Sequence, residues 1–592
     1  MVDQIFRSSL PSVALPRRSI FTHLLGTCPR TPDLVGGFPA SAPAFIDSVT
    51  GSTISRGALR SFALQLAFSL QTPPNPLKAL IHAATPPVVL IFSPNSIVWP
   101  IMLFGAAAAG FRTTLANSAY TPNELKYQYL DSGARLIFAH PSLFGIVQEM
   151  LTSIGYSESD IRSTVVLATS AWFTNTLDPN TNREFSNLTR LEDLLGRGEL
   201  ASEVSFDGER SNDTFCLCYS SGTTGKPKGV ETTHYNLTSV IDIVKPVWPP
   251  KDKLPDVFLG SLPYYHIYGA AKLLLLPVAL CAPTVVVAGF EPDEFLGAIA
   301  KYRATYVLVV PPILVVFARH PAIRKYDLTS LRMIFCGAAP LSPDLVRVVR
   351  ERLQSTGSNV VITQGYGLTE TSPTVFILPL EHASDRVGSV GLLLPNLEVR
   401  LVRENGGEML TDIEGAGELW VRGPTIMKGY LNNPTATAAA ITPDGWLKTG
   451  DIAVRDSGGF FAIVDRRKEL IKYKGFQGES LPPAELESVL LQHPDVADTA
   501  VIGVHSEEEA TELPRAYVVP AKAVPENDAL SFSLGIQRWV ASRVAPHKKL
   551  RGGIVLVKQV PKSAAGKILR RELRDRAKND VAFGQVRARA KL

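Results

Sequence analysis

Ser220-Ser221-Gly222-Thr223-Thr224-Gly225-Lys226-Pro227-Lys228-Gly229 is the stretch on which the interpretation of this chain depends. It follows an apolar run at 215–219 that predicts a buried strand. Glycines and small hydroxyl side chains let a backbone wrap closely around phosphate oxygens, which free N–H groups and lysines can hold. The spacing differs from a Walker A loop, in which four residues separate the glycines and Ser or Thr follows the lysine. The stretch therefore predicts a phosphate-binding loop of another type, with a solvated polar loop as the simpler alternative.

The composition predicts a large globular protein. Its 592 residues exceed one ordinary domain, and 45% hydrophobic against 19% charged residues can fill a substantial core. The net charge of +5 is small for this length and argues against a dedicated nucleic-acid binder. The five cysteines have no CxxC pair and no metal-ligand spacing, which is typical of reduced thiols in an intracellular protein.

The apolar stretches and the two ends of the chain bear on its location. Residues 88–111 and 273–289 contain prolines and predict core elements, so we expect no transmembrane span. Residues 1–26 lack the pattern of a secretory signal. The chain ends in Ala590-Lys591-Leu592, close to the Ser-Lys-Leu peroxisomal address, which predicts peroxisomal localisation through the import receptor. The cytoplasm is the alternative.

Strand-like and helix-like segments alternate along most of the chain. Runs at 306–310 and 360–362 predict buried strands, and 343–352 predicts a helix with Ser342 as its N-cap. Such alternation is typical of an α/β fold with largely parallel sheets. We predict a large domain over 1–464, a hinge at 465–468 and a small α+β domain over 469–592.

A second motif, Gln364-Gly365-Tyr366-Gly367-Leu368-Thr369-Glu370, follows a predicted strand and so lies at the carboxyl edge of a sheet, where α/β folds bind ligands. Together with the first motif it resembles the adenylate-forming superfamily, which includes acyl-CoA synthetases, 4-coumarate–CoA ligases, luciferases and peptide-synthetase adenylation domains. The resemblance extends over roughly residues 50–575. It implies a large N-terminal domain of layered α/β sheets with a β-barrel-like part, and a small mobile C-terminal lid.

The resemblance implies a site for ATP and AMP. It assigns adenine stacking to Tyr366, the α-phosphate to Thr369, Mg²⁺ to Glu370 and the ribose hydroxyls to Asp451. The full set of implied ATP- and AMP-binding residues is Ser220, Ser221, Gly222, Thr223, Thr224, Gly225, Lys226, Pro227, Lys228, Gly337, Ala338, Gln364, Gly365, Tyr366, Thr369, Asp451 and Arg466.

The resemblance also implies catalytic, acyl-binding and CoA-binding residues. The catalytic set is Lys567, on a Gly loop near the C-terminus, with His266, Thr369, Glu370 and Lys472. The acyl-binding set is Tyr265, Tyr268, Lys272, Gly337, Gly365, Pro373, Thr374 and Val375. Lys474 and Gly475 would meet CoA, and Lys468 falls at the hinge, about which the lid is expected to rotate between two half-reactions.

One segment departs from the family pattern. Similar family members continue from Gln477 almost directly into Pro483, whereas residues 478–482 intervene here, beside the expected route of the thiol. The extra residues either change the access of CoA or reflect a gene-model error.

These features together predict an ATP-dependent ligase that activates a carboxylic acid as acyl-AMP and transfers it to CoA. The expected cofactors are ATP, Mg²⁺ and coenzyme A. A stand-alone adenylation enzyme that loads a carrier protein, a luciferase-like oxygenase and a catalytically inactive ligand-binding homologue are the alternatives. The acid is not determined, although small glycines in the acyl set suggest space for an aromatic ring or a medium acyl chain.

Overall fold

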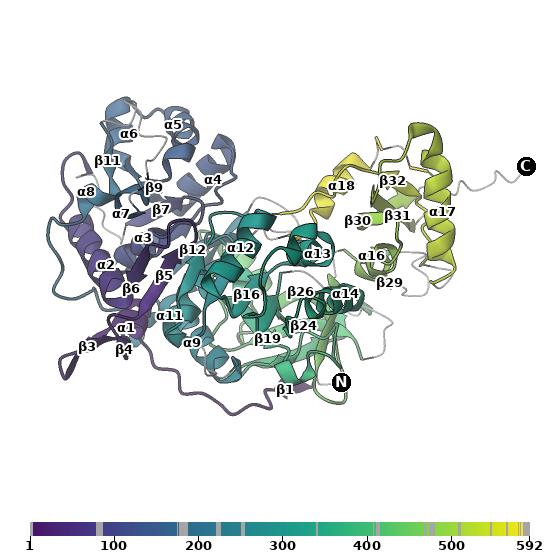
Figure 1. Ribbon diagram of the computed structural model, residues 1–592, viewed down its shortest axis with the longest axis horizontal. Coiled ribbons are helices and arrows are strands. Elements are labelled where there is room, and N and C mark those ends of the chain that lie inside the picture. Colours follow the sequence, from purple (N-terminus) through teal and green to yellow (C-terminus); the bar gives the residue numbers. More distant parts are fainter. Residues whose placement is uncertain are drawn as a thin grey trace, which may run out of the picture.

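The computed structural model consists of a large body and a smaller C-terminal lobe (Figure 1). It describes residues 4–77, 87–174, 176, 187–220, 227–249, 255–338, 341–405, 408–409, 415–466, 469–472, 480–506, 511–544, 548–563, 566–577, 579–580 and 582–583.

An eight-stranded sheet forms one part of the large body. Its central strand β7 (Val88–Phe92) is entirely buried and apolar, as expected for a parallel strand covered on both faces. Val89 and Ile91 belong to the same core cluster as helices α2 (Arg56–Gln71) and α3 (Trp99–Ala108). Leu90 packs with α4 (Pro122–Ser132) and α5 (Phe144–Thr152) on the other face. The strands in spatial order are β11 (Thr189–Arg190), β10 (Val165–Leu167), β9 (Ala134–Ala139), β7, β8 (Arg112–Leu115), β12 (Thr214–Ser220), β13 (Lys228–Thr233) and β25 (Gly429–Tyr430).

A nine-stranded sheet forms the second α/β layer. Its six central strands are parallel, and antiparallel strands close both edges. The strands in spatial order are β20 (Leu392–Leu393), β19 (Thr374–Ile377), β18 (Val361–Gly367), β17 (Met333–Cys336), β16 (Tyr306–Val309), β14 (Phe258–Gly260), β15 (Thr284–Val286), β5 (Pro43–Asp47) and β6 (Thr53–Ser55).

Short sheets and helices complete the large body. The helices besides α2 and α3 are α1 (Ile20–Leu25), α4 (Pro122–Ser132), α5 (Phe144–Thr152), α6 (Glu158–Thr164), α7 (Ala171–Thr174), α8 (Leu191–Leu194), α9 (His234–Val244), α10 (Ile267–Gly269), α11 (Leu276–Leu280), α12 (Pro292–Tyr302), α13 (Pro311–Arg319), α14 (Pro343–Gln354) and α15 (Pro434–Ala440). The remaining strand pairs are β2 (Thr27–Cys28), β3 (Thr31–Val35) and β4 (Phe38–Pro39) in one sheet, and β22 (Glu404–Asn405) with β23 (Glu408–Met409) in another.

The part expected to be β-barrel-like contains a five-stranded antiparallel sheet. It comprises β1 (Ile5–Arg7), β21 (Glu398–Val402), β24 (Gly417–Arg422), β26 (Leu447–Arg455) and β27 (Phe461–Arg466). In β26 and β27, Asp451 and Arg466 are direct cross-strand partners, so the sheet itself brings these two charged residues together.

The C-terminal lobe has its own core of strands and helices. Its elements are β28 (Ile471–Lys472), β29 (Ser480–Leu481), α16 (Pro483–Leu491), β30 (Val496–Ser506), β31 (Thr511–Pro520), α17 (Ala529–Ala541), β32 (Ile554–Leu556) and α18 (Arg570–Arg576). The fold is therefore mixed α/β with a large N-terminal and a smaller C-terminal domain. The division at 465–468 stays a prediction, and Lys468 lies outside the described residues.

The two apolar stretches form short elements separated by turns. Residues 88–111 contain β7 and α3, and 273–289 contain part of a π-helix, then α11 and β15. Within the described part of the chain, no helix combines the length and apolarity needed to cross a bilayer. Ser342 takes the N-cap position of α14, although its side chain makes no capping hydrogen bond.

Candidate active site

A buried carboxylate lies at the junction of the nine-stranded and five-stranded sheets. Tyr366, near the end of β18, donates a hydrogen bond from its hydroxyl to Asp451 Oδ2 at 2.5 Å. Arg466 Nε lies 3.3 Å from Asp451 Oδ1, and the Asp451 side chain is only 4% exposed. Burial raises the pKa of the Asp451 carboxyl, whereas Arg466 and the Tyr366 hydroxyl oppose that rise. This group of residues offers an aromatic ring, a carboxylate and a guanidinium to one ligand.

A second carboxylate, Glu370, lies near the end of the phosphate-loop segment. Glu370 Oε1 accepts a 3.0 Å hydrogen bond from the Tyr430 hydroxyl on β25. Lys228 Nζ lies 4.6 Å from the centre of the Tyr430 ring, and the Pro227 carbonyl accepts a hydrogen bond from Tyr127. Glu370 and Lys228 therefore gather around Tyr430, which the sequence analysis did not single out.

The C-terminal lobe brings Lys567 to these carboxylates. Gly566 takes φ +76°, and a Cβ there would lie 3.2 Å from Pro312 of the large body. Burial and the neighbouring Arg466 lower the pKa of Lys567 to about 8, while Asp451, Glu469 and Glu370 act in the opposite direction. The segment is held by two hydrogen bonds between Ser563 and Lys567.

His266 is close enough to Lys567 for the charge of the lysine to affect its pKa. Its Nδ1 accepts a 3.2 Å hydrogen bond from the backbone N–H of Tyr268, so the ring caps α10. Burial, with a smaller contribution from Lys567, lowers the pKa of His266 to about 4. The ring is therefore neutral at pH 7.

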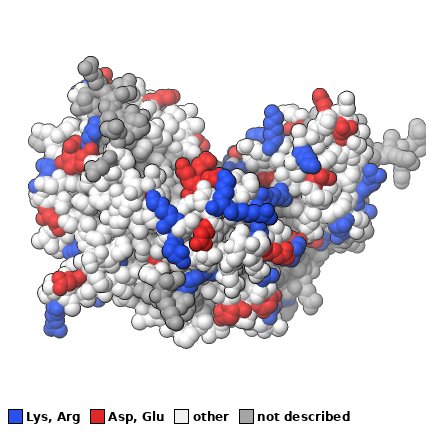
Figure 2. Space-filling view, in the orientation of Figure 1, with Lys and Arg blue, Asp and Glu red and all other residues white. Residues whose placement is uncertain are grey.

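Figure 2 shows the molecule hollowed between its two lobes, with basic and acidic side chains along the hollow.

Tyr268, two residues after His266, packs with Gly337 and Phe335, and we call this group the acyl wall. Tyr268 is 8% exposed and donates a 3.3 Å hydrogen bond to the Phe335 carbonyl. A Cβ at Gly337 would lie 3.2 Å from the Tyr268 ring, and one at Gly365 would lie 2.7 Å from the Phe335 ring. The two glycines therefore make room for aromatic rings of the chain itself, which differs from the expected space for a substrate ring.

The other predicted acyl residues differ in their surroundings. Lys272 is 3% exposed, within a π-helical turn at 270–275. Tyr265 is half-buried, and burial raises the pKa of its hydroxyl. Pro373 and Thr374 are buried near the end of β18, while Val375 is fully buried in the main core cluster.

The backbone is strained where β17 leads into the site. Ala338 has φ +73°, a left-handed conformation that costs a residue with a Cβ about 1–2 kcal/mol. Strained residues cluster at ligand-binding sites, where the surrounding structure maintains them. Ala338 is exposed, next to the buried Gly337.

Several predicted positions lie outside the described residues. They are Ser221, Gly222, Thr223, Thr224, Gly225, Lys226, Lys468, Lys474, Gly475 and Ala590-Lys591-Leu592. The flanking Ser220 and Lys228 are paired between β12 and β13. Gln364 lies within β18 and Thr369 lies just beyond its end, so the motif overlaps the strand that it was predicted to follow.

Two of the residues that intervene at 478–482 belong to a strand beside Lys472. Ser480–Leu481 forms the strand β29, which pairs antiparallel with Ile471–Lys472. Part of the intervening segment is thus the second strand of a ribbon, beside the position predicted to face the adenylate. A strand of two residues is too short to leave an alternating hydrophobic pattern, so the sequence could not indicate it.

The site fits a nucleotide with its metal. Mg²⁺ binds through one or two carboxylates together with phosphate oxygens. Among the described residues, no group of three or more His, Cys, Asp or Glu side chains could hold a metal. Glu370 together with phosphate oxygens would match the donor set that Mg²⁺ takes in nucleotide sites. Asp451 can accept hydrogen bonds from ribose hydroxyls.

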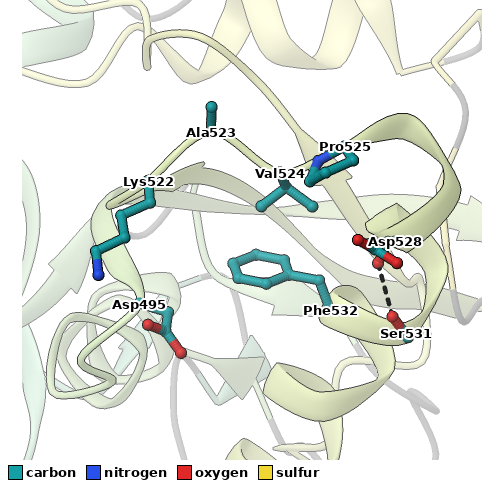
Figure 3. Close-up of a pocket in the computed structure, with 8 residues that line it drawn as sticks. All are labelled: Asp495, Lys522, Ala523, Val524, Pro525, Asp528, Ser531 and Phe532. Carbon is teal, nitrogen blue, oxygen red and sulfur yellow. Dashed lines mark hydrogen bonds between the residues drawn. The ribbon is translucent and has the colours of Figure 1, made fainter.

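A hollow of about 370 Å³ elsewhere in the C-terminal lobe contains none of the predicted site residues (Figure 3). Phe532 of α17 points into it, and Lys522 and Asp495 lie at one side. The lining is mostly exposed, which distinguishes it from the buried groups around Asp451.

Comparison with protein families gives two matches. A model described as "AMP-binding enzyme" matches residues 38–431, and one described as "AMP-binding enzyme C-terminal domain" matches residues 485–567.

Individual relatives and solved structures cover most of the chain. "4-coumarate--CoA ligase-like 4" of Oryza sativa subsp. japonica is 37% identical over 90% of this chain and 89% of its own. "Peroxisomal OPC-8:0-CoA ligase 1" of Arabidopsis thaliana is 34% identical over 90% of each chain. A benzoate CoA ligase structure from Burkholderia xenovorans has a TM-score of 0.73 at 25% identity, covering 90% of this chain and 97% of the other.

Proposed function

Since the chain belongs to the AMP-binding enzyme family, we propose that it is an ATP-dependent acid–thiol ligase that converts a carboxylic acid into its CoA thioester. In the first half-reaction a carboxylate oxygen attacks the α-phosphorus of ATP, and pyrophosphate leaves. In the second, the CoA sulfur attacks the acyl carbon, its proton is lost, and AMP leaves. Relatives named CoA ligases, which cover 90% of this chain, support this reaction.

The observation that carries the proposal is the convergence on one site of Lys567 from the small lobe with Asp451, Arg466 and Glu370 from the large body. The acid and ATP are both anionic, so an ammonium between them offsets their repulsion. Lys567 would bridge the acid oxygen and the α-phosphate in the transition state. A pKa of about 8 leaves the ammonium largely charged at pH 7.

Other residues of this chain would orient the reactants. Asp451 would accept hydrogen bonds from the ribose hydroxyls, with Arg466 offsetting part of its charge, and Tyr366 would stack on adenine. Glu370 would hold Mg²⁺, which supplies charge neutralisation for the phosphates. The neutral His266 would stand beside the attacking carboxylate, with Thr369 at the α-phosphate.

The second half-reaction would use the segment after residue 468. Lys472 and Gln477 would face the adenylate, and Lys474 with Gly475 would contact CoA, after the lobe has turned about Lys468. Most of these positions lie outside the described residues. The β28–β29 ribbon would form one side of the thiol route, because it contains Lys472.

The test is acid-dependent pyrophosphate release, with and without CoA, across phenylpropanoid, phenylacetic and fatty acids. We expect release for at least one acid and formation of its CoA thioester. Lys567→Ala should abolish release, whereas the exposed Lys558→Ala, a matched control in the same lobe, should keep it. Equal release by wild type and Lys567→Ala would contradict the proposed role of Lys567, and release without a CoA product would favour another acceptor, such as a carrier protein.

We also propose that the enzyme works in the peroxisome and binds the import receptor through Ala590-Lys591-Leu592. A relative named peroxisomal, at 34% identity, supports this location. A fluorescent fusion that leaves the C-terminus free should gather in peroxisomes, and deletion of the last three residues should leave it in the cytoplasm. The same distribution of both fusions would contradict the proposal.

A further inference from the structure

Lys272 belongs to the predicted acyl-binding set, and the proposed reaction assigns no role to its buried positive charge. It is 3% exposed, deeper in the fold than the half-buried His266. Burial alone lowers its pKa to about 7, and no charged or hydrogen-bonding group among the described residues contributes to that shift. Burial of an ammonium without an anionic partner is expensive, so such a group is rarely kept without one.

The surroundings of Lys272 are aromatic. Its Nζ lies 5.8 Å from the centre of the Trp248 ring. Trp248 stacks on Phe258 and lies 5.8 Å from Phe335, centre to centre. The indole Nε1 of Trp248 is buried, and it has no hydrogen-bond partner. Among the described side chains, the cluster therefore contains an ammonium that meets an aromatic ring but no carboxylate, and an indole N–H that has no hydrogen-bond acceptor.

This cluster is continuous with the proposed acyl wall. Phe335 contacts Tyr268 through the hydrogen bond from the tyrosine hydroxyl to its carbonyl, with ring centres 6.4 Å apart. Tyr268 follows His266 by two residues, and Lys272 follows Tyr268 by four, about one helical turn further. The turn that contains Lys272 is π-helical, a rare form that is found frequently at functional sites.

We propose that Lys272, with the Trp248 indole N–H, binds a second carboxylate at the far end of the acid, so that the preferred substrates are dicarboxylic acids. A carboxylate accepts hydrogen bonds only and offers two oxygens, which suits two donors. The aromatic rings between His266 and Lys272 would contact the apolar middle of the molecule. This inference rests on the proposed ligase function and names its substrate class.

The test compares straight-chain dicarboxylic acids with monocarboxylic acids of the same length, by CoA-dependent turnover. Wild type should favour one diacid, by kcat/KM, over its matched monoacid. Lys272→Met keeps the length of the side chain and removes the charge, and it should lower the diacid-to-monoacid ratio about tenfold or more. Lys301→Met, which removes an exposed lysine, should leave the ratio unchanged.

A second measurement separates this inference from the ligase proposal. Calorimetric titration of the diacids into the full-length protein, without ATP, should show binding that Lys272→Met weakens about tenfold. If the protein turns over no acid but binds diacids in a way that depends on Lys272, the inference would hold and the proposed ligase function would be overturned. A ratio and a binding constant that are both unchanged in folded Lys272→Met would overturn the inference. Because methionine suits the aromatic surroundings, the melting temperature of this variant should be at least that of wild type.

Discussion

Lys567 should lose its catalytic effect as the pH rises through 8. Burial and Arg466 bring its pKa down to about 8 from the ordinary 10.5. The lysine is charged below this pKa, so about nine tenths of the molecules carry the ammonium at pH 7 and about one tenth at pH 9. Because the proposed transition state needs the ammonium, kcat/KM for the acid should fall about tenfold for each pH unit above 8. A fully exposed lysine would keep its charge to about pH 10.

The assay is pyrophosphate release between about pH 6 and pH 10, with Lys567→Arg as the comparison. Arginine stays charged throughout this range, so the alkaline fall should disappear in the variant, although its altered shape should lower the plateau. The fall in kcat should come at higher pH than the fall in kcat/KM, because bound anions stabilise the ammonium. A flat wild-type profile to pH 10, or the same alkaline fall in Lys567→Arg, would refute the assignment.

Three further changes and one matched control test the surrounding structure. Asp451→Asn removes the charge proposed to bind the ribose hydroxyls, and it should lower kcat/KM for ATP about 10- to 100-fold in steady-state kinetics. An unchanged kcat/KM for ATP would contradict that role. Gly365→Ala puts a Cβ 2.7 Å from the Phe335 ring and should lower the free energy of unfolding by about 1–3 kcal/mol in urea titrations. Gly145→Ala, which has open space in α5, should instead stabilise by about 0.5–1 kcal/mol, and equal effects of the two changes would be inconsistent with the packing. Arg570→Met leaves the buried carboxylates of Glu469 and Glu487 unpaired and should lower the free energy of unfolding of the C-terminal lobe by about 3–5 kcal/mol. Unfolding followed by tryptophan fluorescence would measure this, and a loss below about 1 kcal/mol would argue against the pairing.

The sequence predicted elements whose cause is local. The apolar run at 215–219 lies within β12 (Thr214–Ser220), and the predicted helix at 343–352 lies within α14 (Pro343–Gln354). Both have strong patterns of their own, one of buried apolar residues and one of helical periodicity. The α/β class follows from many such segments in alternation, so it was predicted correctly.

Features that depend on distant contacts could not be predicted in the same way. The glycines at 337 and 365 suggested space for a substrate ring, but their Cβ positions are closed by Tyr268 and Phe335. No spacing in the sequence indicates which ring faces a glycine. Trp248 and Tyr430 also lie far from any motif along the chain, and only the folded structure brings them to Lys272 and Glu370.

The strongest ionic contacts near Lys567 lie within the C-terminal lobe. Arg570, three residues beyond Lys567, pairs with Glu469 and with Glu487 of α16, and all three side chains are about nine-tenths buried. Since each of them follows residue 468, a rotation of the lobe about that position would leave these pairs intact. The contacts that such a rotation would break include the approach of Lys567 to Asp451 and Glu370 and the packing of Gly566 on Pro312. They also include the hydrogen bond from the Ala484 N–H to Asp465 Oδ2. The buried network therefore holds the lobe together as one unit, so the proposed exchange of Lys567 for the segment at Lys472 would be a movement of the whole lobe.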